Sequence, residues 1–267
     1  MAGFLIVNPH AGGGELTDEL VAEAAVRGIE VHLFEPCEDL ALLARAADAD
    51  VLGIAGGDGS LAPVAQVAIE RDVPFVCIPF GTRNHFARDL GLDRDDPISA
   101  LDAFVNGEER RIDVGRANGR LFLNNVSLGL YARLVHGREA HRRRSEAFAR
   151  LRALAILVQH REPIGITIDG RPVEARVVVV SNNAYDLDLL SIGERKNVDG
   201  GLLHLYVPRG LLRRRWIERE GEEFEVDAAA HRLEAAFDGD PEVLETPIDF
   251  TIDPLALRVL TPLRPLA

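Results

Sequence analysis

The sequence contains little of what marks secreted, metal-binding or membrane-spanning proteins. Among its 267 residues there are 2 cysteines, Cys37 and Cys77, and they show no metal-ligand spacing. No apolar run approaches the roughly 20 residues that span a bilayer. The short run Phe4–Val7 lacks the charged front of a secretory signal. Because free cysteines suit a reducing compartment, we expect a cytoplasmic protein.

The chain also has fewer basic than acidic residues. The chain has 43 acidic and 30 basic residues, a formal net charge of -13, while its hydrophobic content of 47% suffices for a packed core. A surface with net negative charge does not attract nucleic acid, so we expect no nucleic-acid partner. Any anionic partner must therefore meet a local basic patch.

Both common nucleotide-binding motifs are missing. The sequence has no G-x-x-x-x-G-K-[ST] segment, and its first glycine-rich stretch, Asn8–Gly14, lacks the G-x-G-x-x-G spacing of dinucleotide-binding folds. A nucleotide site in this chain must therefore be of another type.

The first 113 residues alternate short apolar runs with amphipathic segments. The strands are runs of consecutive apolar residues, as expected when helices cover both faces of a parallel sheet. We therefore predict a doubly wound α/β domain. A further helix is predicted between Asp96, as its N-cap, and Gly107. The other predicted strands are Phe4–Val7, Ile29–Leu33, Val51–Ala55 and Phe75–Ile78, and the helices are Leu16–Arg27, Leu40–Ala47 and Leu61–Glu70.

Beyond Asp113 the pattern changes to hairpins. Asn118-Gly119 and Asp169-Gly170 each separate two β-rich runs, and further strands are predicted at 202–207, 233–237, 248–252 and 257–260. The acidic run Glu218–Asp227 is predicted to be a solvated connection. The predicted domains are a nucleotide-binding α/β domain at 1–113, an antiparallel β-sandwich at 114–254 with a helical insertion near 138–160, and a strand at 255–267 that can return to the first domain.

Three glycine-containing loops each follow a predicted parallel strand directly: Asn8–Gly14, Gly56–Ser60 and Pro79–Asn84. The carboxyl ends of the strands in an open α/β sheet meet at one edge, where ligands bind. Glycine lets backbone N–H groups approach phosphate oxygens, and the helix that follows adds its positive end. A tight turn explains any one of these loops alone, whereas three at one edge predict a polyphosphate site.

The loop sequences are specific enough to indicate a family. The segments Asn8-Pro9-x-x-Gly12, Gly56-Gly57-Asp58-Gly59-Ser60 and Pro79-x-Gly81-Thr82-x-Asn84 resemble, in this order, the diacylglycerol kinase catalytic domain, whose superfamily includes bacterial lipid kinases and sphingosine kinases. The similarity covers nearly the whole chain. It continues at Asp113-Val114-Gly115, Phe122-x-Asn124-Asn125-x-x-x-Gly129, Asp199-Gly200-Gly201-Leu202 and Asp238-Gly239-Asp240.

The resemblance implies an ATP- and Mg²⁺-dependent lipid kinase with a Rossmann-like N-terminal domain and a C-terminal β-sandwich. It implies Asp240 as the proton acceptor and a magnesium site made by Asp199 and the carbonyls of Lys196 and Gly201. Phosphoryl transfer requires a carboxylate near the attacking hydroxyl, and the candidates are Asp58, Asp113 and Asp240. Because Asp58 lies between glycines beside the expected phosphates, we predict that it is a catalytic residue that faces them through a cation. The nucleotide contacts that we expect come from the three loops, at Asn8, Gly12, Gly56, Gly57, Asp58, Gly59, Ser60, Gly81, Thr82, Arg83 and Asn84.

The residues alone leave alternatives open. Asp238-Gly239 is itself a hairpin signal, so Asp240 can be a turn residue, and Asp199-Gly200 allows the same interpretation. Arg83 can pair with phosphate or be a solvated loop residue. The chain also departs from its relatives at Ala62-Pro63, where an Asn-Glu pair is usual, and at His85, where an aspartate is usual.

Two other functions compete with the lipid kinase. NAD kinase or another small-molecule kinase shares a Gly-Gly-Asp-Gly loop, although the Asn8-Pro9 and Pro79-x-Gly81-Thr82 segments favour the lipid branch. A nucleotide-binding regulator without catalysis is suggested by Ala62-Pro63 and His85, whereas the retention of Asp58 and Asp240 favours a kinase.

A lipid kinase must reach its substrate at a membrane surface, and we expect a peripheral protein at the inner face. The segment 138–158 combines an arginine-rich start with apolar residues at helical spacing, and Leu211–Trp216 is similar in type. Either segment can dock on anionic lipid, and a core-packed helix with solvated arginines is the alternative. The sequence also allows the protein to form a homodimer.

Overall fold

The computed structural model describes residues 2–12, 14–129, 164–188, 191–195, 197–208 and 216–263. Packing divides the chain into two compact units, Met1–Asp113 with Leu255–Ala267, and Val114–Pro254. The helical insertion expected near 138–160 and the arginines at 213–215 lie outside the described residues. Within the described part of the chain, no helix has the length and hydropathy required to cross a membrane.

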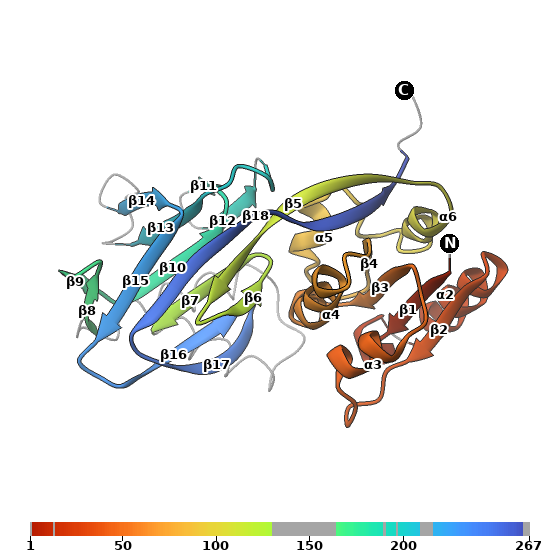
Figure 1. Cartoon of the computed structure of the whole chain (residues 1–267), viewed down its shortest axis with the longest axis horizontal. Helices are drawn as coiled ribbons and strands as arrows, with labels where there is room; N and C mark the ends of the chain where they lie inside the picture. Colours follow the sequence, from red (N-terminus) through yellow and green to blue (C-terminus); the bar gives the residue numbers. More distant parts are fainter. Residues whose placement is uncertain are drawn as a thin grey trace. The chain divides into compact units, whose positions relative to one another are not determined.

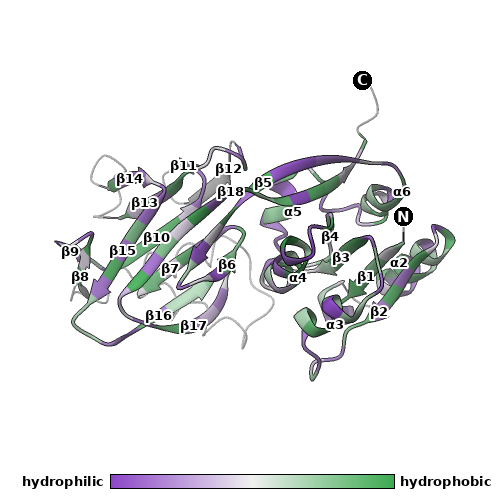
Figure 2. Cartoon of the chain, viewed as in Figure 1, coloured by the Kyte–Doolittle hydropathy of each residue, from purple (hydrophilic) through white to green (hydrophobic). Residues whose placement is uncertain are grey.

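A parallel sheet forms the centre of the unit that contains the N-terminus (Figure 1). Its strands follow the order β2 (Ile29–Leu33), β1 (Gly3–Val7), β3 (Val51–Gly56) and β4 (Phe75–Pro79). Every residue of β1, β3 and β4 is buried, which agrees with their unbroken apolar runs (Figure 2). The connecting helices are α2 (Gly14–Val26), α3 (Leu40–Ala46) and α4 (Asp58–Glu70).

The predicted helix between Asp96 and Gly107 is shorter than expected. A 3-10 turn, η1 (Ser99–Asp102), leads into α6 (Ala103–Asn106), and Pro97 precedes both. The Asp96 carboxylate still accepts a hydrogen bond from Ser99 N at 3.0 Å. Gly107 ends α6 as predicted, because a Cβ there would lie 2.4 Å from the carbonyl oxygen of Ala103.

The Phe104 ring of α6 packs on two glycines of neighbouring strands. A Cβ on Gly3 of β1 would lie 2.7 Å from Phe104 Cδ1, and one on Gly53 of β3 would lie 2.5 Å from Cζ. Both distances are shorter than any ordinary carbon contact, so the ring fills the space that side chains would otherwise occupy. These two glycines therefore provide the surface against which the Phe104 ring of α6 packs.

Two long strands, β5 (Gly107–Ala117) and β18 (Ile248–Pro262), contain residues of both units. In the first unit, Val259 of β18 pairs in parallel with Phe75 of β4. The fully buried carboxylate of Asp113 accepts a hydrogen bond from the backbone N–H of Leu255 at 2.8 Å, where Leu255 has φ +52°. A buried charge thus holds β18 at an irregular point of its backbone.

The second unit consists of two β-sheet layers. One is a six-stranded sheet with the order β14-β13-β10-β7-β16-β17, and the other contains β8, β9, β15, β6 and parts of β5 and β18. Side chains from both sheets, among them Phe122, Phe250 and Val180, form one buried core. A separate pair of strands is β11 (Tyr185–Asp188) with β12 (Ser191–Arg195). The other strands of this unit are β6 (Arg120–Phe122), β7 (Asn125–Gly129), β8 (Ile164–Ile168), β9 (Arg171–Ala175), β10 (Val177–Asn182), β13 (Leu203–Val207), β14 (Ile217–Gly221), β15 (Glu223–Ala228), β16 (Arg232–Phe237) and β17 (Asp240–Glu245).

The predicted hairpins are confirmed by their backbone angles. Asn118-Gly119 has φ of +48° and +78°, and Asp169-Gly170 has φ of +51° and +70°. Positive φ at both central residues is the requirement of the two-residue turn that matches the twist of paired strands. The fold class, an α/β unit followed by an antiparallel β unit, is therefore as predicted.

One prediction for this unit is wrong. The acidic run Glu218–Asp227 is not a solvated connection, because it forms most of β14 and β15. Its charged residues alternate with Phe224 and Val226, which are buried in the core, while the glutamates face outward. The two-residue period of a strand outweighs the total charge of the segment.

The contact between Phe104 and Gly53 leads to the first prediction. We expect Gly53→Ala to destabilise the protein by roughly 1–3 kcal/mol, because the added methyl group overpacks a closed core. Phe104→Leu in the same chain removes the ring tip and should recover part of the loss. Urea unfolding followed by circular dichroism measures both variants. Equal stability of wild type and Gly53→Ala would show that the ring moves away freely.

Candidate active site

The three glycine-containing loops emerge side by side at the carboxyl edge of the parallel sheet. Val7 of β1 pairs with Ala55 of β3, and Ala55 pairs with Ile78 of β4, so the strands end at the same level. The backbone N–H of Asn8 donates to the Ala55 carbonyl at 2.9 Å. The sheet register therefore brings the loops together, as the sequence predicts.

The loops after β3 and β4 touch through two glycines. A Cβ on Gly81 would lie 2.5 Å from the Cα of Gly57 and 3.1 Å from its nitrogen. No side chain larger than hydrogen fits at Gly81, so the backbones of the two loops lie against each other. This close approach leaves the loop N–H groups near one another at the sheet edge.

The Asp58 carboxylate joins the same two loops. Asp58 begins α4, and its Oδ2 and Oδ1 accept hydrogen bonds from the backbone N–H groups of His85 at 3.1 Å and Phe86 at 3.0 Å. These donors are the first residues of α5 (His85–Asp89). The negative charge thus lies at the amino end of that helix, where it is stabilising.

Two other predicted site residues shape their own loops. Asn84 is buried with φ +49°, its Oδ1 accepts from Gly81 N at 2.8 Å, and its Nδ2 donates to Gly81 O at 3.0 Å. Ser60 Oγ donates to the carbonyl of Gly57, the N-cap of α4, at 2.7 Å. Both side chains therefore use these bonds to fix the loop backbone.

The first loop is held by an aromatic contact. It begins at Asn8 and passes through the short helix α1 (Pro9–Gly12), where Asn8 Oδ1 accepts from His10 N at 3.1 Å. A Cβ on Gly12 would lie 2.4 Å from the buried ring of Phe80, which follows β4. Gly12 is thus needed for packing between the first and third loops.

The third loop exposes the side chains of Thr82 and Arg83, between Gly81 and Asn84. Arg83 has its carbonyl bonded to Arg94 at 3.0 Å. Gly56 ends β3, Gly57 is the N-cap of α4, and Gly59 lies in the first turn of α4, which presents N–H groups without intrahelical acceptors. The edge thus combines backbone donors with a hydroxyl and a guanidinium, a set suited to phosphate oxygens.

Two departures from the family pattern fall within this site. Pro63 lies inside α4, where it supplies no backbone N–H to the helix. His85 begins α5, and burial of its ring lowers its pKa, although the nearby Asp58 carboxylate acts in the opposite direction. The ring is therefore favoured in its neutral form beside the predicted phosphate site.

In the second unit, the Asp238 carboxylate accepts hydrogen bonds from the backbone N–H groups of three consecutive residues. Asp238 Oδ1 accepts from Asn124 N at 2.7 Å and Asn125 N at 3.1 Å, and its Oδ2 accepts from Leu123 N at 2.9 Å. Asp238 and Gly239, with φ of +48° and +97°, form the two-residue turn between β16 and β17. The turn interpretation of Asp238-Gly239 is therefore correct.

A buried arginine holds the same segment from its carbonyl side. Arg195 donates from Nη1 to Leu123 O at 2.6 Å and to Asn182 O at 3.1 Å, and from Nη2 to Asn124 Oδ1 at 3.1 Å. Arg195 is 6% exposed. Because a guanidinium carries several donors in a rigid fork, one side chain fixes two strand ends at once.

The candidate carboxylates Asp199 and Asp240 are exposed. Asp240 is the first residue of β17, directly after the turn that Asp238 fixes. Asp199 is exposed too, and the turn that follows it is held by Gly200 N, which donates to Asn183 Oδ1 at 2.9 Å. Gly201 has φ +71°.

Of the expected magnesium ligands, Asp199 and Gly201 are described by the structure, and Lys196 lies outside the described residues. One carboxylate and two backbone carbonyls are hard oxygen donors of the kind that magnesium prefers, so the donor set fits this ion. Among the described residues no group of three or more histidine, cysteine, aspartate or glutamate side chains is placed to hold a metal. A site made mainly of carbonyls would not depend on such a group.

The sequence did not indicate the roles of Arg195, Asn182 and Asn183. All three are buried, and Asn183 Nδ2 donates to Asn182 Oδ1 at 3.2 Å. One signal was present, because Ser181-Asn182-Asn183 follows four consecutive valines of a buried strand, where exposed polar residues are not expected. Nothing near Arg195 in the sequence indicates that its side chain is buried.

Residues 2–117 of the chain match the diacylglycerol kinase catalytic domain family. The chain is 29% identical over 213 residues to the diacylglycerol kinase of Mycobacterium tuberculosis H37Rv, which covers 74% of this chain and 66% of the relative. It is 37% identical over 89 residues to the diacylglycerol kinase of Bacillus subtilis, which covers 33% of this chain and 29% of the relative. The matched segments thus span less than two thirds of either relative.

The fold is shared over a greater length than the sequence. A crystal structure of a diacylglycerol kinase from Bacillus anthracis superposes with a TM-score of 0.72 and covers 97% of this chain and 96% of that chain, at 22% identity. The similarity therefore confirms the two-part α/β and antiparallel β fold.

The lowered pKa of His85 predicts how stability depends on pH. Because the unfolded chain binds a proton at His85 more readily than the folded chain, the stabilisation is present above about pH 6.5 and is lost as the pH falls below it. We expect His85→Gln to flatten the fall in unfolding free energy between pH 7.5 and 5, with urea titrations as the measurement. Burial also lowers the pKa of His204, so some slope should persist. The exposed His231→Gln is the control. Identical slopes in all three proteins would contradict the prediction.

The acceptor role of Asp238 gives a second prediction for the site. Asp238→Asn keeps a residue that tolerates positive φ before glycine, yet it replaces one acceptor oxygen by a donor. A buried backbone N–H then loses its partner, and we expect a loss of about 1–3 kcal/mol in unfolding free energy. Asp249→Asn, at an exposed position of β18, removes the same charge as a control. The carboxylate is dispensable if both variants unfold at the same urea concentration.

Proposed function

We propose that this protein is an ATP-dependent lipid kinase, which transfers the γ-phosphoryl group of ATP to a hydroxyl of a diacylglycerol-like lipid. The observation that carries the proposal is the convergence of three glycine loops at one sheet edge, in a chain whose residues 2–117 match the diacylglycerol kinase catalytic domain family. Cofactors in this proposal are ATP and Mg²⁺.

The nucleotide-binding half of the proposal rests on the backbone of the loops. The contact between Gly57 and Gly81 brings two loops within van der Waals distance, and glycine at both positions lets a triphosphate approach their N–H groups. Thr82 and Arg83 are exposed beside them and would bind phosphate oxygens. Asn8, Gly12, Gly56, Gly59, Ser60 and Asn84 would support this surface by fixing the loops.

Asp58 would then act mainly as a positioning residue. Because its two oxygens accept from His85 and Phe86, it ties α5 to the start of α4 and sets the separation of the two loops. The sequence suggested instead a carboxylate that faces the phosphates through a cation. The observed contacts favour the positioning role and leave a second role toward a bound ion as a proposal.

Magnesium would be held by Asp199 and the carbonyls of Lys196 and Gly201. When bound, it would neutralise charge and fix the turn at 199–201 in the second unit. Asn183 would support this site, because its Oδ1 accepts a hydrogen bond from Gly200 N–H and so fixes the turn before an ion binds. A preset turn costs less entropy on ion binding than a flexible one.

The chemistry assigned to Asp240 is proton transfer. The lipid hydroxyl oxygen attacks the γ-phosphorus, its proton passes to the Asp240 carboxylate, and the bond to the β-phosphate oxygen breaks to release ADP. Asp240 is exposed and lies directly after a turn fixed by three hydrogen bonds to Asp238, so its backbone is held while its side chain meets solvent. These features suit a general base.

The lipid acceptor and the membrane contact are part of the same proposal. A chain with net charge -13 is repelled by an anionic membrane as a whole, so a peripheral contact must be local. We place the protein in the cytoplasm at the inner membrane face, with no nucleic-acid partner. The arginine-rich segments 138–144 and 213–215, which would make the contact, lie outside the described residues.

One specific observation favours a second candidate, a nucleotide-binding regulator without catalysis. Pro63 removes one backbone hydrogen bond of α4. The lowered pKa of His85 favours an uncharged ring at a position where relatives usually have an acid. These changes affect the residues beside the predicted nucleotide site. A regulator would bind ATP without turnover on any lipid, which separates it from the kinase.

The experiment is a phosphoryl-transfer assay on a panel of lipids with free hydroxyl groups, with wild type and Asp240→Asn. We expect turnover with one lipid class, and a fall of about 10²–10⁴-fold in kcat for Asp240→Asn with ATP affinity kept, because a general base contributes this much. Glu245→Gln, at the far end of β17, is the matched control. ATP binding without turnover on any lipid would support the regulator instead.

A further inference from the structure

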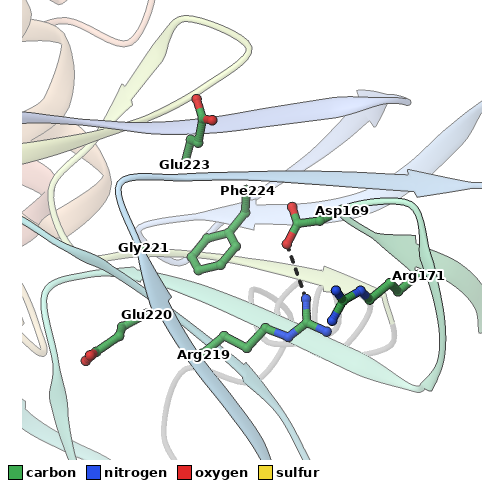
Figure 3. A pocket seen from close by; sticks show the side chains of 7 residues that line it. All are labelled: Asp169, Arg171, Arg219, Glu220, Gly221, Glu223 and Phe224. Carbon is green, nitrogen blue, oxygen red and sulfur yellow. Dashed lines mark hydrogen bonds and ion pairs between the residues drawn. The ribbon is translucent and has the colours of Figure 1, made fainter.

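A pocket in the second unit is unused by the proposed kinase chemistry. It has a volume of about 470 Å³, a size typical of small-molecule sites. It lies where the β8–β9 turn meets β14 and β15, and none of its lining residues belongs to the glycine loops or to the turns at Asp199 and Asp240. The lining residues are Asp169, Arg171, Arg219, Glu220, Gly221, Glu223 and Phe224 (Figure 3).

Hydrogen bonds of Asp169 fix one wall of the pocket. Asp169 Oδ1 accepts from the backbone N–H of Glu225 at 3.0 Å, and Asp169 N donates to Glu225 O at 3.0 Å, so the β8–β9 turn is fixed to β15. Asp169 Oδ2 accepts from Arg219 Nη1 at 3.2 Å. The guanidinium of Arg219 is thereby oriented, and the buried ring of Phe224 forms an apolar surface beside it.

The second guanidinium of the pocket belongs to Arg171. Within the described residues, the exposed side chain of Arg171 makes no hydrogen bond or ion pair, although it lines the same pocket as Arg219. Figure 3 shows the carboxylates of Glu220 and Glu223 pointing away from the two guanidinium groups. Inside the pocket two positive charges therefore face one negative charge, that of Asp169.

We propose that this pocket binds the phosphate group of a phosphomonoester, with the carbon skeleton of the ligand against Phe224. Arg171 and Arg219 come from different strands, so they can take different oxygens of one tetrahedral anion, in the way that guanidinium groups bind phosphate. The chemistry is shared by a soluble sugar or glycerol phosphate and by a lipid whose headgroup is a phosphomonoester.

The test compares binding by wild type, Arg171→Gln and Arg232→Gln. Arg171→Gln removes a guanidinium that makes no hydrogen bond or ion pair in the described part of the chain, so the fold should be unaffected. Arg232→Gln is a matched control, because Arg232 is an exposed arginine of the same unit that pairs with Glu245. Glycerol 3-phosphate is titrated by calorimetry at constant ionic strength. We expect binding to weaken about tenfold or more in Arg171→Gln only, because a lost charged hydrogen bond has this effect.

A second arm identifies the source of the phosphate. Co-sedimentation is measured with phosphatidylcholine vesicles that contain or lack phosphatidic acid. Arg171-dependent binding to the phosphatidic acid vesicles assigns a lipid headgroup, and Arg171-dependent binding of glycerol 3-phosphate alone assigns a small soluble ligand. The proposal is overturned if neither probe binds, or if Arg171→Gln binds both probes as wild type does. Because these readouts involve no turnover, failure of the kinase assay leaves the result intact.

Discussion

The hydrogen bond between an aspartate carboxylate and backbone N–H groups of a distant segment recurs throughout this structure. Asp58 accepts from α5, Asp113 from β18, and Asp238 from the segment between β6 and β7. A carboxylate with two oxygens accepts several such bonds, and each bond to a charged group contributes about 1.5–3 kcal/mol. Because the donors are backbone atoms, these bonds fix the course of the chain and not only the side chains. The loops of the predicted site depend on them for their shape.

The features that the sequence predicts correctly do not depend on these charged contacts. The parallel strands follow from unbroken apolar runs, the hairpins follow from Asn-Gly and Asp-Gly pairs, and the shared edge of the three loops follows from strand direction alone. Each of these features depends on residues close together in the chain. The acidic strands β14 and β15 were predictable on the same ground, since Phe224 and Val226 alternate with acids, and the error came from weighing net charge above periodicity.

The partners of the aspartates were beyond prediction for a physical reason. Asp58 bonds to residues 27 and 28 positions later, and Asp238 bonds to residues more than 110 positions earlier. An aspartate between glycines has the same local pattern whether it faces a cation or a helix terminus, so only the folded chain distinguishes the two. Arg195 is a similar case, because a lone arginine at the end of a short strand is usually solvated, and its burial follows from carbonyls that the fold brings to it.

The same distinction separates the residues that hold the site from those exposed to solvent beside it. Asp58, Asn84, Ser60 and Asp238 direct their polar atoms to the backbone, whereas Thr82, Arg83, Asp199 and Asp240 are exposed at or beside the segments so fixed. A ligand therefore meets preset loops and has few side chains to order, which lowers the entropic cost of binding. In the proposed kinase, changes in the exposed set would alter the choice of acceptor or nucleotide without disturbing the fold. Changes in the buried set would alter the loops first and the chemistry as a consequence.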